Sequence, residues 1–481
     1  MHIVDMIYFW ARTVPNRLAI IQSEMVTTFQ GLADAIESIG ERIDRLNLNK
    51  SEPVAVCLAN PSFLIATSFA LMRNGYSVAP VNVRLYPHLA AAGIRNLIYD
   101  MDGQVTSGGR NIRFDMSWLP SPGEPTAARE YRKRPNENPD LIFFTSGTTG
   151  FPKKIIQSAA SLDQVLSNPV TRMAAAFQKA LIMPGLSSGY GFRRTCELLN
   201  SGKTVCFAPD VMAALSLINL FGVEVVLAST AQALSLSQLK NENPGFRTDS
   251  LRTIFVAGGK IDAEGIARIQ TALCRNVIDY YSSSEVGLVA LSVADSRAGI
   301  PGATVLPWAE LEIVDEANRL LPTGADGFVR VRTPYLVENI KSAGRNEIAG
   351  VQNGWFYPGD VGSLDEDGML HLVGRDSDVL NRGGVKVSGI RVEEILKQML
   401  EVADAGVCGV AGPSGLEEIW IALIVKGDVD IEAIKQHLRE HSDVGIAPDE
   451  IFIVDQIPRT ELGKIQKYRL KELLLGLKNG A

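Results

Sequence analysis

The feature that most constrains this chain of 481 residues is a repeated alternation of helix-like and strand-like segments. Residues 29–46 place apolar side chains at helical spacing, and the apolar run 53–58 that follows is typical of a buried parallel strand. Residues 63–72 and 77–81 repeat the same pair. We therefore predict a doubly wound α/β layer over residues 1–136.

The same alternation resumes from about residue 155 to 295, and strands are expected at 203–207, 223–227 and 251–259. The last of these ends in the pair Gly258-Gly259. In sheets of this kind, ligands bind beyond the carboxyl ends of the strands. Three loops follow predicted strands, and we expect them to converge: 145–153, 257–260 and 280–287.

Further along the chain the pattern changes twice. Residues 296–375 contain short alternating runs separated by Gly, Pro and Asp, which predict a small, antiparallel, barrel-like unit. Residues 376–481 predict a compact α+β tail, with helices at 392–400, 430–442 and 466–477. The fold class is therefore α/β, with a small β unit and a small α+β unit at the end.

Composition excludes several classes of partner. The 47 Lys and Arg residues against 54 Asp and Glu residues give a net charge of −7, with no long basic block. This balance disfavours a nucleic-acid or anionic-membrane surface. The cysteines are scattered and form no C-x-x-C pair, which indicates a reducing compartment and no zinc site; they are Cys57, Cys196, Cys206, Cys274 and Cys408.

No segment reads as a targeting or membrane signal. Residues 1–12 lack the basic flank and apolar core of a signal peptide. The longest apolar stretch, 213–236, is interrupted by Gly222 and Glu224, so we expect a helix, a turn and a buried strand rather than a membrane span. We predict a cytoplasmic protein.

The segment 139–157 is the first that carries chemistry. Its apolar run 141–144 predicts a short buried strand, and Lys153 lies nine residues beyond that run. Between them come six small residues: Thr145, Ser146, Gly147, Thr148, Thr149 and Gly150. Such residues let several backbone N–H groups approach one anion, and the lysine adds positive charge. The segment predicts a polyphosphate-binding loop; a plain surface loop is the alternative, and the Walker A spacing is absent.

This string resembles the phosphate loop of the adenylate-forming enzymes, the superfamily of acyl-CoA synthetases, peptide-synthetase adenylation domains and luciferases. Segment 279–285 resembles the family's Tyr-Gly-Ser-Thr-Glu motif, with Ser282 where the family usually has glycine. By this resemblance Tyr281 stacks on adenine, Ser284 contacts the α-phosphate and carboxylate region, and Glu285 helps to hold Mg²⁺. It also implies nucleotide contacts from Asp279 and Tyr280 and from the Gly258-Gly259 pair, and a magnesium contact from Thr145.

Three later segments complete the resemblance in the family's order. Segment 354–360 matches Gly-Trp-Phe-x-Thr-Gly-Asp except for Tyr357-Pro358, and its Asp360 would bind the ribose hydroxyls. Segment 374–378 matches Gly-Arg-x-x-Asp, so Arg375 would contact the nucleotide beside a hinge at 375–378. The glycine-rich segment with Gly384 and Lys386 resembles the hairpin that lines the thiol tunnel.

The final segment, 458–465, resembles the motif that delivers a lysine to the acid's carboxylate and the α-phosphate, which assigns that role to Lys464. The resemblance implies a large adenylation domain at 1–375 and a mobile C-terminal cap at 376–481. The large domain would comprise α/β subdomains at 1–180 and 181–295 and a β subdomain at 296–375.

The family's acyl pocket maps onto segments 185–192, 228–230, 257–259 and 286–288. No Lys, Asp or Glu in these segments would pair with an amino acid's α-amine, so we expect an apolar acyl or aryl acid. The residues implied for the pocket are Tyr190, Gly191, Thr230, Ala257 and Val286.

The resemblance implies an acid–thiol ligase that uses ATP, Mg²⁺ and coenzyme A. It would adenylate the acid with release of pyrophosphate and then transfer the acyl group to the thiol. One alternative is an adenylation enzyme that loads an acyl carrier protein. Another, of a different class, is a degenerate homologue that binds nucleotide or acyl group without turnover; Lys154, Ser282, Tyr357-Pro358 and Ser377 depart from the family pattern. The expected oligomeric state is a monomer or homodimer.

Overall fold

The computed structural model describes residues 3–101, 109–120, 139–145, 153–158, 161–162, 177–259, 261, 263–294, 302–337, 339–341, 350–375, 379–382, 385–412, 417–441, 447–459, 463 and 465–480. By residue number the chain divides into two compact units. Unit 1 comprises 1–147, 151–310 and 332–351, and unit 2 comprises 148–150, 311–331 and 352–481.

The first sheet of unit 1 has the strand order β18-β8-β7-β4-β3-β5-β6. Its strands from β7 to β6 are parallel to their neighbours, whereas β8 and β18 are antiparallel. The bounds are β3 Val54–Cys57, β4 Val78–Pro80, β5 Asn96–Tyr99, β6 Arg110–Arg113, β7 Leu141–Thr145, β8 Lys153–Gln157 and β18 Asn339–Lys341. The strands predicted at 53–58, 77–81 and 141–144 are confirmed.

The second sheet of unit 1 runs β15-β14-β13-β12-β11-β9-β10-β1-β2, with parallel pairing from β13 to β1. The bounds are β1 Leu18–Gln22, β2 Met25–Thr28, β9 Lys179–Ile182, β10 Thr204–Cys206, β11 Val225–Ser229, β12 Thr253–Ala257, β13 Asn276–Ser283, β14 Gly287–Val293 and β15 Ala303–Val305. The three strands expected at 203–259 are present. Strand β1 pairs with β10, so residues 18–22, close to the N-terminus, join the second sheet.

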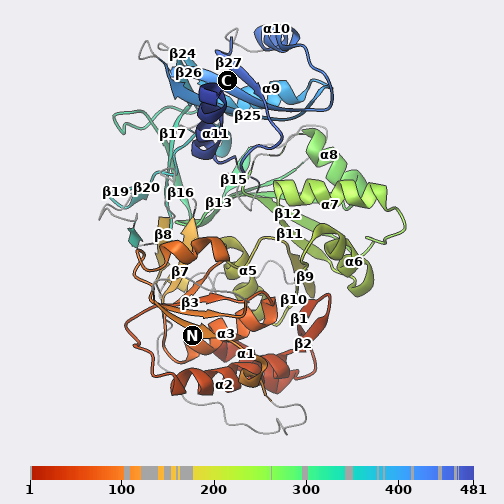
Figure 1. Cartoon of the computed structure of the whole chain (residues 1–481), viewed down its shortest axis with the longest axis vertical. Coiled ribbons are helices and arrows are strands. Elements are labelled where there is room, and N and C mark those ends of the chain that lie inside the picture. The colour runs from red at the N-terminus through yellow and green to blue at the C-terminus, as the bar shows by residue number, and fades with distance from the viewer. Residues whose placement is uncertain are drawn as a thin grey trace. The chain divides into compact units, whose positions relative to one another are not determined.

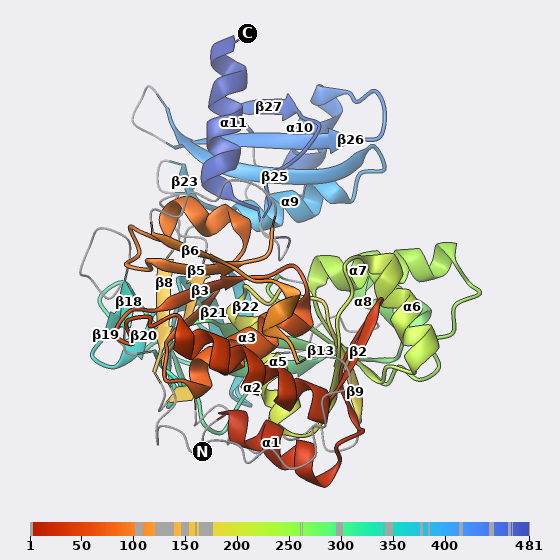
Figure 2. The ribbon, with the colours of Figure 1, turned by 60° about the horizontal axis from the view of Figure 1, so that its bottom comes forward.

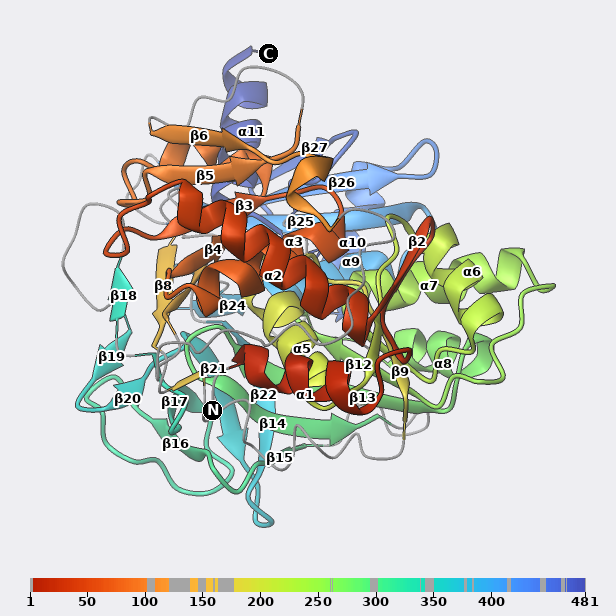
Figure 3. The same cartoon turned by 90° about the horizontal axis from the view of Figure 1, so that it is seen from below.

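Helices fill the space between these sheets and cover one outer face. The bounds are α1 Ile3–Thr13, α2 Phe29–Arg45, α3 Pro61–Arg73, α5 Gly189–Asn200, α6 Val211–Phe221, α7 Thr230–Glu242 and α8 Ala263–Ala272, with short 3₁₀ turns at Val83–His88 and Met116–Trp118. Apolar side chains of α1, α2, α3 and α5 share one core with both sheets, and Figure 3 shows α2 and α3 side by side. The other face of the second sheet packs against α6, α7 and α8, seen in green in Figure 1.

Local sequence signals explain where these helices begin and end. Thr28 caps α2 by accepting from the Gly31 N–H, and Asn60 caps α3, whose first residue is Pro61. Gly222 ends α6 in a left-handed conformation with φ 62°. The stretch 213–236 is therefore the predicted helix, turn and buried strand. No helix in the described parts of the chain is long and apolar enough to cross a membrane.

The strands that lie mostly in unit 2, or at its boundary, follow the order β19-β20-β17-β21-β22, with β16 beside β17. Antiparallel pairs join β17 to β20, β17 to β21, and β21 to β22. A separate hairpin pairs β23 with β24. The bounds are β16 Glu310–Val314, β17 Gly327–Arg332, β19 Val351–Gln352, β20 Trp355–Phe356, β21 Asp360–Leu364, β22 Met369–Arg375, β23 Val379–Arg382 and β24 Val385–Ser388. The short antiparallel strands predicted within residues 296–375 are thus present among the described residues.

The C-terminal part of unit 2 is a three-stranded sheet covered on both faces. The bounds are β25 Val402–Ala411, β26 Glu417–Val425, β27 Glu450–Ile453, α9 Gly389–Lys397, α10 Ile431–His441 and α11 Lys467–Gly480. Apolar residues of α9 and α10 pack on one face, and Leu470 and Leu474 of α11 pack on the other. Figure 2 shows α11 crossing the sheet. The α/β, β and α+β architecture is as predicted, whereas the hinge residues 376–378 lie outside the described residues and the domain boundaries stay predictions.

The start of α7 offers a test of how the sequence fixes a helix near the strand ends. Buried Ser229 accepts from the Gln232 N–H at 3.2 Å, and the Gln232 side chain accepts from the Ser229 N–H at 2.9 Å. Because this capping box satisfies two helix-end donors, Ser229→Ala should lower the free energy of unfolding by about 1 kcal/mol. Urea denaturation measures this. The control Ser216→Ala, within α6, should change it by less than about 0.5 kcal/mol; equal losses would contradict the capping argument.

Candidate functional site

Parallel pairing brings the ends of β11, β12 and β13 to one edge of the second sheet. Ser229 is opposite Ala257, and Ala257 is opposite Tyr280. Beyond the strand ends, the Thr230 hydroxyl donates to the Gly259 carbonyl at 2.8 Å. The structure thus brings the described parts of loops 257–260 and 280–287 together, beside two of the residues predicted for the acyl pocket.

The turn after β13 accommodates the departure at Ser282. The β13–β14 pairing contains an irregularity between Tyr281 and Ser282, as in a β-bulge. Among the described residues other than glycine, only three have positive φ: Asn47, Asn318 and Asn353. Ser282 therefore occupies this position without the backbone strain that would demand glycine.

The same turn holds its backbone firmly, and its Glu285 carboxylate lies within electrostatic range of the buried Arg193. The Ser283 hydroxyl accepts from the Glu285 N–H at 3.2 Å, and the Val337 N–H donates to the Glu285 carbonyl at 2.9 Å. The Thr333 hydroxyl donates to the Val286 carbonyl at 3.0 Å. The half-buried Glu285 carboxylate makes no hydrogen bond or ion pair with any residue that the structure describes, so its oxygens can accept a cation.

Arg193 connects this turn to the strand that leads into the predicted phosphate loop. Its buried guanidinium donates to the Gly189 carbonyl at 2.9 Å and to the Ser284 carbonyl at 3.3 Å. It also lies 5.7 Å from the ring centroid of Phe143, in β7. Burial, and then the neighbouring Arg194, lower the pKa of Arg193 to about 10, so it is charged at neutral pH. None of the recognised motifs contains Arg193, and its one local signal in the sequence is the Arg193-Arg194 pair.

Arg194 lies between two aromatic rings that the sequence analysis singled out. Its guanidinium is 5.7 Å from the ring centroid of Tyr190 and 5.6 Å from that of Tyr280, and it forms an ion pair with Glu197 at 2.5 Å. Burial raises the pKa of Tyr280 to about 12. The predicted pocket residue Tyr190 and the predicted nucleotide residue Tyr280 thus share one cation.

Gly191 allows the start of α5 to approach the chain before it. A Cβ at this position would lie 2.5 Å from the Gly185 carbonyl oxygen and 2.6 Å from that of Pro184. Any larger residue would push the helix away from residues 184–185. The role of Gly191 in the structure is therefore close packing beside Tyr190. Buried Val286, also predicted for the pocket, follows Glu285 in the β13–β14 turn.

The predicted phosphate loop joins two antiparallel strands, with Thr145 opposite Lys153 in the β7–β8 pairing. Residues 146–152, which include Ser146, Gly147, Thr148, Thr149 and Gly150, lie outside the described residues, as does the side chain of Thr145. Lys153 is half-buried at the start of β8. The unusual Lys154 has a structural contact, since its ammonium group donates to the Ala92 carbonyl at 2.8 Å.

In unit 2 the structure brings two predicted nucleotide residues together. Asp360 is opposite Arg375 in the β21–β22 pairing, and their Oδ1 and Nε atoms are 3.1 Å apart. Asp360 is buried, with 8% of its surface exposed. Lys386 belongs to β24, but its side chain is not described; Gly384 and Lys464 lie outside the described residues.

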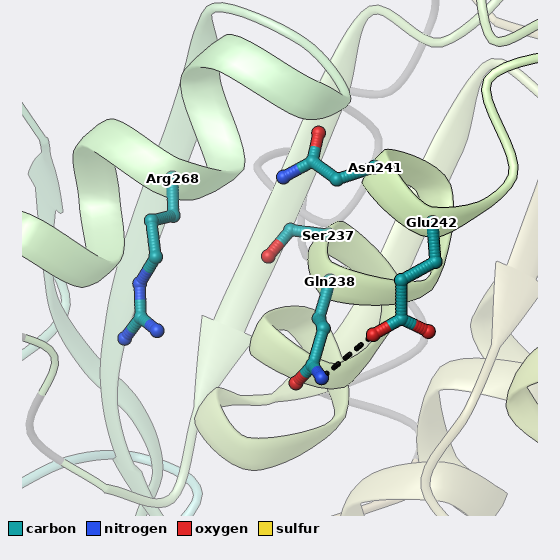
Figure 4. Close-up of a pocket in the computed structure, with 5 residues that line it drawn as sticks. All are labelled: Ser237, Gln238, Asn241, Glu242 and Arg268. Atoms are coloured by element: carbon teal, nitrogen blue, oxygen red, sulfur yellow. Dashed lines mark hydrogen bonds between the residues drawn. The ribbon is translucent and has the colours of Figure 1, made fainter.

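A pocket elsewhere in unit 1 has a different character. It lies between α7 and α8, and every residue that lines it is polar: Ser237, Gln238, Asn241, Glu242 and Arg268 (Figure 4). The first of these is seven residues beyond Thr230, which corresponds to about 10 Å along a helix. None of the predicted site residues lines this pocket, so it is separate from the strand-end site.

Comparison with known proteins gives a match over most of the chain. A family model described as AMP-binding enzyme matches residues 8–339, and a second, described as AMP-binding enzyme C-terminal domain, matches residues 391–464. A salicylyl-CoA synthase / salicylate adenylyltransferase of Streptomyces sp. is 24% identical over 97% of this chain and 92% of that protein. A 3-hydroxybenzoate–CoA ligase of Aromatoleum sp. (strain CIB) is 25% identical over 96% of this chain and 95% of that protein.

A solved structure supports the fold. The chain resembles the O-succinylbenzoate coenzyme A synthetase of Bacillus subtilis, solved in complex with ATP and magnesium ion, with a TM-score of 0.83. The identity is 23%, and the match covers 97% of this chain and 99% of that one. The arrangement of α/β layers with a smaller C-terminal part is therefore one that known proteins share.

Asp279, in the middle of β13 and one residue before Tyr280, has a titration that tests how deeply this part of the sheet is buried. Burial raises its pKa to about 7, above the value of about 3.9 for an unfolded chain. The native state then holds this proton more tightly, so its contribution to stability is complete below pH about 4 and is lost as pH rises through about 7. The free energy of unfolding should fall by at most about 1.4 kcal/mol per pH unit in this window.

Asp279→Asn should remove this fall, which urea denaturation at several pH values measures. Asp249→Asn is the control, because the Asp249 carboxylate is 75% exposed beside Arg247. An Asp279→Asn variant with the pH dependence of the wild type would show that the carboxyl is not desolvated.

Proposed function

Because the chain belongs to the AMP-binding enzyme family, we propose that it is an acid–thiol ligase. It adenylates an apolar acyl or aryl carboxylic acid with ATP, releases pyrophosphate, and passes the acyl group to coenzyme A. The observation that carries this proposal is the turn after β13, where the buried guanidinium of Arg193 donates to the Ser284 carbonyl and interacts electrostatically with Glu285. A fixed cation held at the backbone of a turn that carries a serine and a glutamate suits the joining of two anions.

The residues present fit a magnesium ion at Glu285. Within the described residues no group of three His, Cys, Asp or Glu side chains could hold a metal ion. Mg²⁺ binds through one or two carboxylates together with substrate phosphates, so the single carboxylate of Glu285 is enough. Glu285, with Thr145 as the second candidate, would hold the ion, which when bound neutralises phosphate charge.

The remaining roles follow the family's motifs. Lys153 and residues 145–150 would hold the β- and γ-phosphates, and Tyr281 would stack on adenine. In unit 2, Asp360 would accept from the ribose hydroxyls while its partner Arg375 fixes the carboxylate. The hairpin with Gly384 and Lys386 would serve the thiol step.

Lys464 supplies the charge that the adenylation step requires. A carboxylate repels nucleophiles and has no good leaving group, so its oxygen must first attack the α-phosphate and expel pyrophosphate. Both partners are anions, and an ammonium group placed between them stabilises the charge that develops. The thiol then attacks the acyl carbon and AMP leaves. We infer that the C-terminal domain moves between the two steps. Lys464 cannot remain over the α-phosphate while the thiol enters from the same side.

An aryl acid is favoured among the apolar substrates. The relatives named above act on salicylate and 3-hydroxybenzoate by their names. At the strand-end edge, the rings of Phe255 and Tyr280 have centroids 4.9 Å apart, and aromatic pairs of this kind provide flat apolar surface. The charge of Arg194 beside Tyr280 is already compensated by Glu197, so it leaves no free cation for a second carboxylate.

The test is pyrophosphate release from ATP across a panel of acids, with and without coenzyme A. The panel contains benzoate, hydroxybenzoates, a medium-chain fatty acid and several amino acids. We expect release with an aryl or apolar acid and thioester formation when coenzyme A is added. Release without thioester on coenzyme A would favour loading of a carrier protein. No release with any acid would favour a binding protein without turnover.

Lys464→Ala should slow acyl-AMP formation by about 10² to 10³-fold, because one preorganised donor to the developing charge is lost. The same variant should still pass acyl groups from supplied acyl-AMP to coenzyme A. Single-turnover assays of each half-reaction measure this. Lys478→Ala is the control, since Lys478 of α11 forms a partly exposed ion pair with Glu450 of β27. An adenylation rate equal to that of the wild type would remove Lys464 from the mechanism.

A further inference from the structure

The backbone on both sides of Lys464 is tied down by described residues. Arg459 and Ile465 form an antiparallel bridge, and the Gln466 N–H donates to the Pro458 carbonyl at 2.8 Å. These contacts bring the two ends of the loop 459–465 side by side. Gly463 in this loop has φ 81°, a left-handed conformation that favours glycine.

One side chain links the Gly463 carbonyl of this loop to the neighbouring sheet. The Arg459 guanidinium donates to the Gly463 carbonyl at 2.6 Å. Its other terminal nitrogen donates to both carboxylate oxygens of Asp404, at 2.9 and 2.7 Å. Asp404 lies near the start of β25 and also pairs with Lys397 at 2.9 Å. We call Asp404, Arg459 and the Gly463 carbonyl the arginine clamp.

The contacts of Asp404 keep it in its charged form. Burial alone would raise the pKa of Asp404, but the ion pairs with Lys397 and Arg459 hold it below its ordinary value. At neutral pH the clamp therefore joins a carboxylate to a guanidinium, and such charge-assisted contacts are among the stronger hydrogen bonds in proteins.

A second contact fixes the chain just after the loop. The ammonium group of Lys467, the first residue of α11, donates to Glu393 at 2.5 Å and to the Val407 carbonyl at 2.6 Å. The same Glu393 carboxylate accepts from the Val407 N–H at 2.9 Å. The start of α11 is thereby attached to α9 and β25, so both ends of the loop are held by one rigid layer.

The clamp acts on Lys464 through covalent geometry. The peptide group between Gly463 and Lys464 is planar, so the Gly463 carbonyl oxygen shares a plane with the nitrogen and Cα of Lys464. A hydrogen bond to that oxygen orients the plane from which the lysine side chain begins. A displacement of a catalytic group by about 1 Å can lower the rate about 10²-fold.

We propose that Arg459, held by Asp404, is a positioning residue that orients the backbone of Lys464 for the adenylation step. This rests on the function proposed above for Lys464. Only an arginine can donate to a carboxylate through one nitrogen and to a carbonyl through another in a fixed fork; a lysine provides a point charge without that geometry.

The test compares the two half-reactions in Arg459→Lys and Asp404→Asn. Arg459→Lys should lower the kcat of acyl-AMP formation by about 10-fold or more, with KM for ATP and acid within about twofold of the wild type. Transfer from supplied acyl-AMP to coenzyme A should be unchanged. Asp404→Asn should act in the same direction and less strongly. The matched control Lys397→Gln removes the other partner of Asp404, leaves the clamp intact, and should change neither half-reaction by more than about twofold.

A double variant separates positioning from general stability. If Arg459 acts only through Lys464, Arg459→Lys should cause no further loss of adenylation when Lys464 is already alanine, because the two changes then remove one function. An additional loss in the double variant would overturn the proposal. So would a fall in both half-reactions together for Arg459→Lys alone.

Amide hydrogen exchange gives a readout that needs no turnover. In Arg459→Lys the segment 459–466 should exchange at least about 10-fold faster, while β25 and β26 keep their wild-type protection. Unchanged exchange in this segment would overturn the clamp. A wild-type protein that releases no pyrophosphate would instead overturn the proposed function, so the two failures are distinguishable.

Discussion

Parallel pairing of β9, β11, β12 and β13 aligns the carboxyl ends of four strands, and the candidate site of unit 1 depends on this alignment. The ladder fixes which residues lie level with one another, for example Ala257 with Tyr280. The first residues beyond the ladder no longer hydrogen-bond to neighbouring strands. In sheets of this kind, ligands bind at these strand ends. Gln232 strengthens the edge, since its amide donates to the Met183 carbonyl at 2.9 Å and ties α7 to the end of β9.

In both units, side chains from other segments hold the backbone beside residues proposed for catalysis. In unit 1 the carbonyls of Ser284 and Val286 accept from Arg193 and Thr333. In unit 2 the carbonyl of Gly463 accepts from Arg459. The contacts that hold the backbone are then made by neighbouring residues and not by the side chain proposed for catalysis. Such support keeps reacting groups close to one geometry without occupying the atoms that must meet the substrate.

The sequence predicts the elements of this fold better than their assembly. The helix α2 and the strand β3 are found from apolar periodicity, because both bury a continuous face. Strand β6 was missed, since it lies in a segment rich in Gly and Arg and buries only Ile112. The pairing of β1 with β10 joins Ile20 to Val205, and no local pattern reports so distant a contact.

For the site, motifs identify side chains but not the contacts that hold them. Tyr281, Glu285 and Asp360 are found by resemblance. Arg193 belongs to none of these motifs, and its partner Ser284 is 91 residues away in the chain. Ser282 could be recognised from the sequence only as a departure; the irregular pairing beside it and its ordinary backbone conformation are properties of the sheet.

The burial of Arg193 also determines how its field responds to the surrounding solution. Mobile ions screen charges at a surface over about 8 to 10 Å at physiological ionic strength, but they screen a buried group much less. Only 8% of Arg193 is exposed, so counterions have little access to its guanidinium. The contribution of Arg193 to the potential at the Ser284 turn therefore arises in the protein interior and stays nearly constant when the electrolyte changes.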